Sequence, residues 1–174
     1  IIAITGSYGK TSTKEFLKTI LSEKFNVLAT PDHKNSEIGI SQTILNELNG
    51  KHDIFIVEMG SYKKGGIKLL CDIVKPQIGI VTGVNEQHLA TFKSMENLLS
   101  AEGGQELLLC LKKDGLLVVN GDNKYCMDLF KKANIDKKMY SVESSRVDAD
   151  IYSKEITVDK HFLDFIAIQK GGQA

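Results

Sequence analysis

A lysine and two hydroxyl residues, Lys10-Thr11-Ser12, stand directly after a glycine-bearing turn near the start of the chain. A lysine ammonium binds the outer phosphates of a nucleotide, and a neighbouring hydroxyl binds Mg²⁺. Where such a turn opens a helix, free backbone N–H groups and the helix dipole favour an anion. The turn is a shortened relative of the common phosphate loop, because Ile4 stands where that pattern has its first glycine. The residues expected to contact the nucleotide are Gly6, Ser7, Tyr8, Gly9, Lys10, Thr11 and Ser12.

The alternative for this stretch is a glycine-rich turn that only joins a strand to a helix. Further along the chain, other polar side chains follow apolar runs that read as strands. Glu58 follows Val57, His88 lies a few residues after Val81, and Asn120 follows Val119. A carboxylate at the end of a buried strand usually has a partner, so Glu58 is a candidate ligand of Mg²⁺ or of its water. The competing interpretations are a surface carboxylate for Glu58, a structural histidine for His88 and an ordinary turn at Asn120.

These polar residues need a scaffold, and the chain alternates strand-like and helix-like segments. Strands are expected at 1–4, 53–60, 78–82 and 115–120, and their continuous apolar stretches are typical of parallel strands buried on both faces. We therefore predict an α/β fold, a mostly parallel P-loop-type sheet flanked by helices, with a small β region at the C-terminal end. In such sheets ligands bind beyond the carboxyl ends of the strands, which is where the polar residues fall.

Two local predictions concern helices. Phe16, Leu17, Ile20 and Leu21 recur at helical spacing, so they are expected to form the buried face of the first helix. A long helix is expected from Ser94 to about Leu111, interrupted by a glycine pair at 103–104. A polar loop is expected at 30–37, and strands without helices at 138–142, 150–158 and 162–168.

Composition narrows the class of protein. The chain has 174 residues, with 22 basic and 22 acidic side chains, so bulk charge predicts no nucleic-acid partner. Cys71, Cys110 and Cys126 are odd in number and widely spaced, which favours buried free thiols, a reducing setting and a cytoplasmic location. No apolar run approaches membrane-spanning length, so no membrane association is expected. Both ends look like cuts through a longer polypeptide, and we expect a monomer.

Five segments together resemble the Mur ligase family of peptidoglycan precursor synthesis, which also includes folylpolyglutamate synthetase. The resemblance covers about residues 1–135, and it is specific because the segments occur in the same order and at similar spacing. Val57-Glu58-Met59-Gly60 most resembles the branch that adds the D-alanyl-D-alanine dipeptide. The five segments are 5–12 (TGSYGKTS), 35–39 (NSEIG), 57–60 (VEMG), 82–89 (TGVNEQHL) and 120–123 (NGDN).

The resemblance implies roles for individual residues. Lys10 and its loop would hold the phosphates of ATP, and Thr11 with Glu58 would serve one Mg²⁺. His88 is similar to the residue that serves a second Mg²⁺, and Asn120 to one near the adenine. The implied chemistry is ATP-driven amide formation, in which a carboxylate becomes an acyl phosphate and an amine displaces phosphate. The implied partners are a nucleotide-linked peptide acceptor and a dipeptide or amino-acid amine.

Three positions depart from the family pattern. Gly83 stands where the family usually has Asn, and Gly66 where the dipeptide-adding branch usually has Glu. The family's long helix carries a carbamoylated lysine, whereas the matching stretch here contains Glu102 followed by two glycines. Because glutamate carries a permanent carboxylate, we predict that Glu102 takes the place of that lysine as a catalytic residue. A solvated helix glutamate is the alternative.

On the resemblance, residues 1–174 are the central ATP-binding domain, without the acceptor-binding N-terminal domain and the C-terminal ligase domain. Three alternatives stay open. Another Mur-type amino-acid ligase, including a cyanophycin-type enzyme, would share these motifs. An unrelated P-loop kinase or NTPase explains the first 15 residues, though not Glu58, His88 and Asn120 together. A nucleotide-binding homologue without ligase activity fits the three departures.

Overall fold

The computed structural model describes residues 1–32, 34–143 and 145–171. Its framework is an eight-stranded sheet in the order β2-β3-β1-β4-β5-β6-β7-β8. All neighbouring strands from β2 to β7 pair in parallel, and β8 pairs antiparallel with β7. This confirms the predicted α/β class. The strands are β1 (Ile2–Thr5), β2 (Val27–Ala29), β3 (Ile54–Glu58), β4 (Ile78–Val81), β5 (Leu116–Asn120), β6 (Asp136–Ser141), β7 (Ile151–Val158) and β8 (Leu163–Gln169).

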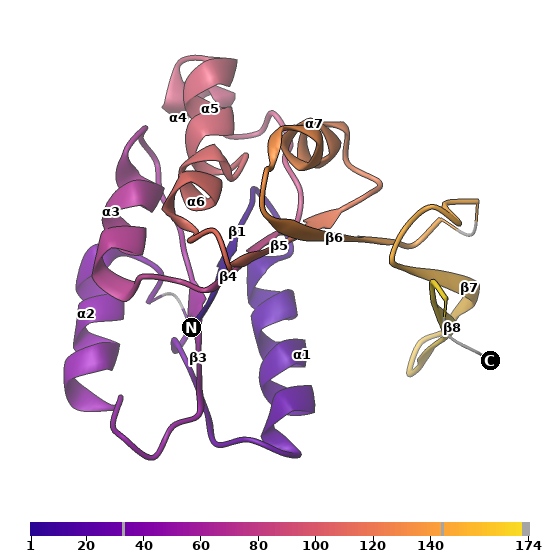
Figure 1. Cartoon of the computed structure of the whole chain (residues 1–174), viewed down its shortest axis with the longest axis horizontal. Coiled ribbons are helices and arrows are strands. Elements are labelled where there is room, and N and C mark those ends of the chain that lie inside the picture. Colours follow the sequence, from indigo (N-terminus) through magenta and orange to yellow (C-terminus); the bar gives the residue numbers. More distant parts are fainter. Residues whose placement is uncertain (33, 144, 172–174) are drawn as a thin grey trace.

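Helices cover the two faces of the sheet unequally (Figure 1). Helix α1 packs on one face, over a small apolar cluster that includes Ile4, Ile56 and Ile80. The other helices bury a larger cluster against the opposite face. The helices are α1 (Lys10–Ser22), α2 (Glu37–Asn46), α3 (Gly66–Val74), α4 (Leu89–Phe92), α5 (Met95–Ala101), α6 (Gln105–Cys110) and α7 (Lys124–Lys132).

The buried face of α1 differs from the prediction. Phe16 and Ile20 are each 67% exposed, whereas Lys14 is completely buried. Leu17 and Leu21 do pack on the sheet, against the cluster around Ile4. The stripe that faces the protein therefore runs through positions 14, 17 and 21. Apolar periodicity alone missed it, because a lysine occupies its first position.

The interruption predicted at the glycine pair is present, and it divides the expected helix at 94–111 into two helices, α5 and α6, joined by a sharp turn. Gly104 adopts a left-handed backbone conformation, with φ 78°. A Cβ atom at this position would lie 2.5 Å from Cγ2 of Val81 and 3.0 Å from Cδ2 of Leu129. The second glycine is thus needed both for its backbone conformation and for the close approach of the turn to β4.

Replacing Gly104 should test this turn. We expect Gly104→Ala to lower the free energy of unfolding by about 2–4 kcal/mol, combining left-handed strain with overpacking. Gly65→Ala is the matched control, because Gly65 also has a positive φ of 86° but no atom within 4 Å of the added Cβ. That variant should lose only about 1 kcal/mol. Urea denaturation of both variants measures the difference, and equal losses would contradict the packing argument.

The C-terminal strands continue the sheet beyond its helical layers. β7 pairs with β6 through only two residue pairs, whereas β7 and β8 form a longer antiparallel hairpin. In Figure 1 this hairpin projects away from the body of the domain. The strands expected at 138–142, 150–158 and 162–168 are therefore present, with shifted ends. The polar loop expected at 30–37 is shorter by one residue, because Glu37 is the first residue of α2, and His33 within it lies outside the described residues.

The three cysteines carry free thiols. Cys71 and Cys126 are buried, as predicted, and Cys110 is half-buried. Burial raises the pKa of the Cys126 thiol to about 12 and raises the pKa of Cys71 further. Both thiols are thus protonated, and poor nucleophiles, at neutral pH. Separately, none of the helices in the described part of the chain is long and apolar enough to span a membrane.

Candidate nucleotide site

The candidate site lies at the carboxyl edge of the sheet, where β1 and β4 are neighbours. After β1 the chain crosses to β2 and β3 on one side, and after β4 it continues to β5 on the other. Loops that follow β1 and β4 therefore diverge, and a crevice at such a switch point is the usual ligand site of open α/β sheets. The predicted residues from the first four segments meet around this point.

The phosphate loop joins β1 to α1 through two glycines with positive φ. Gly6 has φ 141° and Gly9 has φ 75°, conformations that residues with a Cβ rarely adopt. A Cβ at Gly6 would also lie 2.3 Å from the hydroxyl of Thr82. The ammonium of Lys10 curls back over the loop and donates a hydrogen bond to the Gly6 carbonyl at 2.6 Å. The loop thus keeps a positive charge at the N-terminus of α1.

Glu58 at the end of β3 faces the first turn of α1. Its side chain is buried, and Oε2 accepts a hydrogen bond from the Thr11 hydroxyl at 3.0 Å. Its Oε1 accepts from the amide of Asn35 at 3.1 Å. The backbone N–H of Glu58 donates to the hydroxyl of Thr30, which fixes the end of the strand. A hydroxyl and a carboxylate oxygen therefore lie side by side next to the phosphate loop.

The ammonium of Lys14, which lies on α1, also faces the Glu58 carboxylate. Its ammonium lies 3.1 Å from Oε1 of Glu15, 3.2 Å from Oδ1 of Asp32 and 3.7 Å from Oε2 of Glu58. Burial by itself lowers the pKa of the Lys14 ammonium, but hydrogen bonds to Glu15 and Asp32 and the charge of Glu58 raise it above its usual value. Lys14 is therefore a permanent cation at physiological pH.

Glu102 links the phosphate loop to His88. Its Oε2 accepts a hydrogen bond from the Ser7 hydroxyl at 2.6 Å, and its Oε1 lies 2.8 Å from Nδ1 of His88. Glu102 is only 4% exposed, so it is not the solvated helix glutamate of the alternative interpretation. The Ser7 hydroxyl also accepts from the backbone N–H of Asn85, which ties the loop after β1 to the loop after β4. The break between α5 and α6 places Glu102 at this point.

The departure at position 83 has a steric explanation. A Cβ atom at Gly83 would lie 2.3 Å from the phenol oxygen and 2.4 Å from Cζ of Tyr8. The Tyr8 ring thus occupies the space that a side chain at position 83 would need. The Tyr8 hydroxyl lies 3.4 Å from the amide nitrogen of Asn123, and the Tyr8 carbonyl accepts from Thr82 at 2.5 Å. The phosphate loop is therefore packed against the loop after β4 and the loop after β5.

The residues after β5 mainly organise their own loop. Asn120 donates to the carbonyl of Thr82 at 3.0 Å and accepts from the N–H of Asp122 at 2.9 Å. The carboxylate of Asp122 accepts from Ser141 and from the N–H of Val142, which holds the turn against β6. Asn120 lies at the carboxyl edge of the sheet, next to β4, with both ends of its amide engaged.

Several contacts that shape the site were not predicted from the sequence, although Asn35 and Asn123 lie in two of the segments that carry the resemblance. Lys14 and Asn35 hold Glu58, and Asn123 caps α7 while reaching Tyr8. Outside the site, Glu106 accepts hydrogen bonds from the N–H groups of Gly65 and Lys68 and so satisfies the first turn of α3, which was not predicted either. The available signal was weak in each case. The partner of a polar residue can be inferred only when the sheet topology is known, because the partner lies far away in the sequence.

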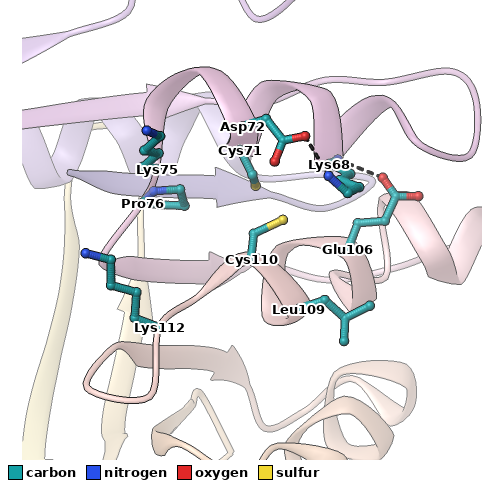
Figure 2. A pocket seen from close by; sticks show the side chains of 9 residues that line it. All are labelled: Lys68, Cys71, Asp72, Lys75, Pro76, Glu106, Leu109, Cys110 and Lys112. Carbon is teal, nitrogen blue, oxygen red and sulfur yellow. Dashed lines mark hydrogen bonds and ion pairs between the residues drawn. The ribbon is translucent and has the colours of Figure 1, made fainter.

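A separate cavity lies between α3 and α6, away from the nucleotide site. This cavity of about 320 Å³ is lined by the C-terminal part of α3 and by residues around the end of α6. Figure 2 shows Cys71 and Cys110 on its walls and the ion pair between Lys68 and Asp72 at its rim. Lys75 and Lys112, which also line it, precede β4 and β5, so one end of the cavity lies near the amino edge of the sheet. It is separate from the phosphate loop.

A parallel sheet, a glycine loop with Lys-Thr at the start of the first helix and an acidic residue on the adjacent strand define a P-loop-type nucleotide-binding domain. Comparison with protein families narrows this class. Residues 4–173 match the family described as the Mur ligase middle domain, and the chain belongs to the Mur ligase family.

Curated relatives with similar sequences are UDP-N-acetylmuramoyl-tripeptide–D-alanyl-D-alanine ligases. The protein from Synechocystis sp. is 37% identical over 160 residues, which cover 91% of this chain and 35% of the relative. The one from Escherichia coli K12 is 28% identical over 165 residues, or 95% of this chain and 36% of the relative. The chain therefore spans little more than a third of the length of these relatives.

Solved structures agree with this fold. MurF ligase from Thermotoga maritima, in complex with ADP, superimposes with a TM-score of 0.81 at 26% identity, covering 97% of this chain and 39% of that one. MurF from Acinetobacter baumannii has a TM-score of 0.78 at 24% identity, covering 97% and 38%. The second similarity concerns the fold alone.

Proposed function

We propose that the chain is the ATP-binding domain of a ligase that joins D-alanyl-D-alanine to a UDP-N-acetylmuramoyl-peptide. The observation that carries the proposal is the meeting of Lys10, Thr11 and Glu58 at the carboxyl edge of a Mur ligase middle domain. The names of the relatives supply the two substrates. The ADP in the Thermotoga maritima complex supports ATP as the nucleotide.

The proposal assigns this chain to the centre of a larger enzyme. Its support is the description of the matching family as a middle domain and the 35% share of the Synechocystis relative that the chain covers. On this proposal, a preceding domain holds the nucleotide-linked acceptor, and a following domain closes over ATP and delivers the amine. We accordingly expect ligation by the full-length polypeptide and none by residues 1–174 alone, because closure completes such sites.

The residues beside the loop suit Mg²⁺. Thr11 and Glu58 offer hard oxygen donors, and Mg²⁺ is usually held by one or two carboxylates together with substrate phosphates. The described residues include no cluster of three or more His, Cys, Asp and Glu side chains able to hold a metal ion unaided. Thr11 and Glu58 would therefore hold Mg²⁺ jointly with the phosphates of ATP. When bound, the ion neutralises charge that develops on the transferred phosphoryl group.

The chain's own groups then have distinct tasks. Loop N–H groups and the Lys10 ammonium would bind the phosphates and stabilise negative charge as the γ-phosphoryl group moves to the acceptor carboxylate. Ser7 and Glu102 connect the phosphate loop to His88, which lies in the loop after β4, and so fix the position of one relative to the other. No protein nucleophile is required, because positioning and charge stabilisation carry this type of transfer.

Glu102 and His88 form a second group of candidate ligands. We infer that the pair takes the place of the histidine and carbamoylated lysine of the family near a second Mg²⁺. The support is the 2.8 Å contact between them and the 2.6 Å bond from Glu102 to the phosphate loop. The inference also accounts for the burial of Glu102. A buried carboxylate is costly unless it has a partner, and a bound cation would be such a partner.

A second candidate is a nucleotide-binding homologue that no longer ligates. Gly83 and Glu102 favour it, since both replace residues typical of the family. Two observations argue against this second candidate. Tyr8 fills the space that a side chain at position 83 would need, and Glu102 contacts His88, so both replaced positions are still part of an ordered site.

An omission assay separates these functions. Full-length protein is mixed with Mg²⁺-ATP, UDP-N-acetylmuramoyl-tripeptide and D-alanyl-D-alanine, and ADP is measured with each substrate left out in turn. We expect ADP only when both substrates are present, together with a product of the mass of the amide. ADP without either substrate would indicate ATP hydrolysis that is not coupled to ligation and would contradict the proposal. Nucleotide binding without ADP would indicate the homologue that does not ligate, and a preference for another amine would indicate another branch.

A further inference from the structure

Lys14 is a fully buried lysine whose ammonium contacts three carboxylates. It follows Lys10 by four residues on α1, so both side chains lie on the same side of the helix. Lysine is almost never fully buried unless it is paired. Its burial beside the phosphate loop therefore calls for an explanation beyond the packing of α1.

The three carboxylates around Lys14 are unlike one another. The side chains of Glu15 and Asp32 are 52% and 69% exposed, so water stabilises them without help from Lys14. The side chain of Glu58 is only 6% exposed. Lys14 is the one cation within ion-pair distance of Glu58 among residues 1–32, 34–143 and 145–171. The buried charge that depends on Lys14 is therefore that of Glu58.

Glu58 is held from three sides. Thr11 and Lys14 approach Oε2, and Asn35 donates to Oε1. Because the Lys14 ammonium lies 3.7 Å from the same oxygen that Thr11 contacts, a divalent cation at Thr11 and Glu58 would meet a positive charge close by. At this range in a partly buried site the repulsion is large. Phosphates of a bound nucleotide would offset it, since they bring several negative charges.

We propose that Lys14 is a positioning residue that acts as the internal counter-ion of Glu58, so that the divalent cation binds together with the nucleotide and not before it. The proposal rests on the proposed function only in taking Thr11 and Glu58 as the metal side of the nucleotide site. It gives Lys14 a task that an apolar side chain does not perform. A purely structural ion pair, in contrast, can often be replaced by an apolar residue of similar volume without effect on function.

The test is binding of Mn²⁺, a paramagnetic substitute for Mg²⁺, to the chain without nucleotide. Free Mn²⁺ is followed by electron paramagnetic resonance for the unmodified chain, Lys14→Met and Lys14→Arg. We expect Lys14→Met to bind Mn²⁺ at least about 10-fold more tightly than the unmodified chain, because a nearby positive charge is removed. Lys14→Arg keeps the charge and should bind like the unmodified chain. With ADP present, the difference between Lys14→Met and the unmodified chain should shrink.

Equal Mn²⁺ binding by Lys14→Met and the unmodified chain would overturn the proposal, and so would a Lys14→Arg variant that behaves like Lys14→Met. Circular dichroism shows whether each variant folds. Lys14→Gln, which is neutral but keeps a polar end, replaces Lys14→Met if the latter unfolds. If both neutral variants unfold, the role of Lys14 is structural and the proposal fails.

The double variant Lys14→Met with Glu58→Gln locates the metal. It should lose the added Mn²⁺ affinity, because the carboxylate that attracts the ion is gone. Retained affinity would place the metal away from Glu58, which would contradict the proposed nucleotide site as well. A full-length protein that binds Mn²⁺ in this pattern but fails to ligate would contradict the proposed function and leave the role of Lys14 standing.

Discussion

Lys10→Ala should weaken binding of Mg²⁺-ATP to the chain by about 10- to 100-fold, because a charge-assisted contact to phosphate contributes about 1.5–3 kcal/mol. The side chain of Lys10 reaches over the phosphate loop to the Gly6 carbonyl and is not part of the apolar clusters. We therefore expect the variant to keep its fold. Isothermal titration calorimetry measures the affinity, and thermal unfolding checks stability.

Lys18→Ala is the matched control for this variant. Lys18 lies on the same helix and is exposed, without an ion pair in the described residues. It should bind Mg²⁺-ATP like the unmodified chain. Equal affinity of Lys10→Ala and the unmodified chain would show that the loop does not hold the phosphates.

Glu102→Gln should lower the turnover of the full-length enzyme by about 10-fold or more, as expected when a charged group is removed from a metal or phosphate site. The substitution keeps the size of the side chain but removes the charge between Ser7 and His88. One of the two contacts also loses its acceptor, since an amide offers only one oxygen. Steady-state ADP formation with both substrates measures the effect.

Two controls accompany Glu102→Gln. Glu23→Gln changes an exposed glutamate at the end of α1 and should leave turnover unchanged. Because Glu102 carries its carboxylate permanently, turnover of the unmodified enzyme should not change when bicarbonate is removed or restored. A kinetically silent Glu102→Gln, or an activity that follows bicarbonate, would assign the role to a lysine elsewhere.

Contiguous features of the fold and site could be predicted from the sequence. The phosphate loop is a single stretch of residues, and its glycines and Lys10 specify its backbone and charge locally. The parallel strands could be predicted as well, because strands buried on both faces are continuously apolar. Glu58 was predictable as a site residue for the same reason, since it directly follows such a run.

Features that depend on contacts between distant residues were missed. Periodicity placed Phe16 and Ile20 on the buried face of α1, yet the stripe that faces the sheet runs through Lys14, Leu17 and Leu21, and both predicted side chains are exposed. Lys14 is buried instead, because carboxylates from three segments surround its ammonium. Likewise, nothing local to Gly83 indicates that a tyrosine 75 positions earlier fills its space.

The placement of Glu102 lies between these cases. Its residue type and its neighbouring glycines indicated a close approach of the helix to the site, and the turn at Gly104 does bring the carboxylate to the phosphate loop. The interruption of the expected helix was predicted, but its extent was not, since two adjacent glycines are compatible with a kink as well as with the complete break between α5 and α6.

The central claim is that this chain binds ATP for transfer of its γ-phosphoryl group to a carboxylate. It is tested most directly with acceptor peptide labelled with ¹⁸O in the reacting carboxylate. Full-length protein, Mg²⁺-ATP and D-alanyl-D-alanine are added, and the released phosphate is analysed by mass spectrometry. Passage through an acyl phosphate predicts one ¹⁸O atom in each phosphate released, in step with amide formation. Phosphate without ¹⁸O, formed while ATP is consumed, would contradict the account.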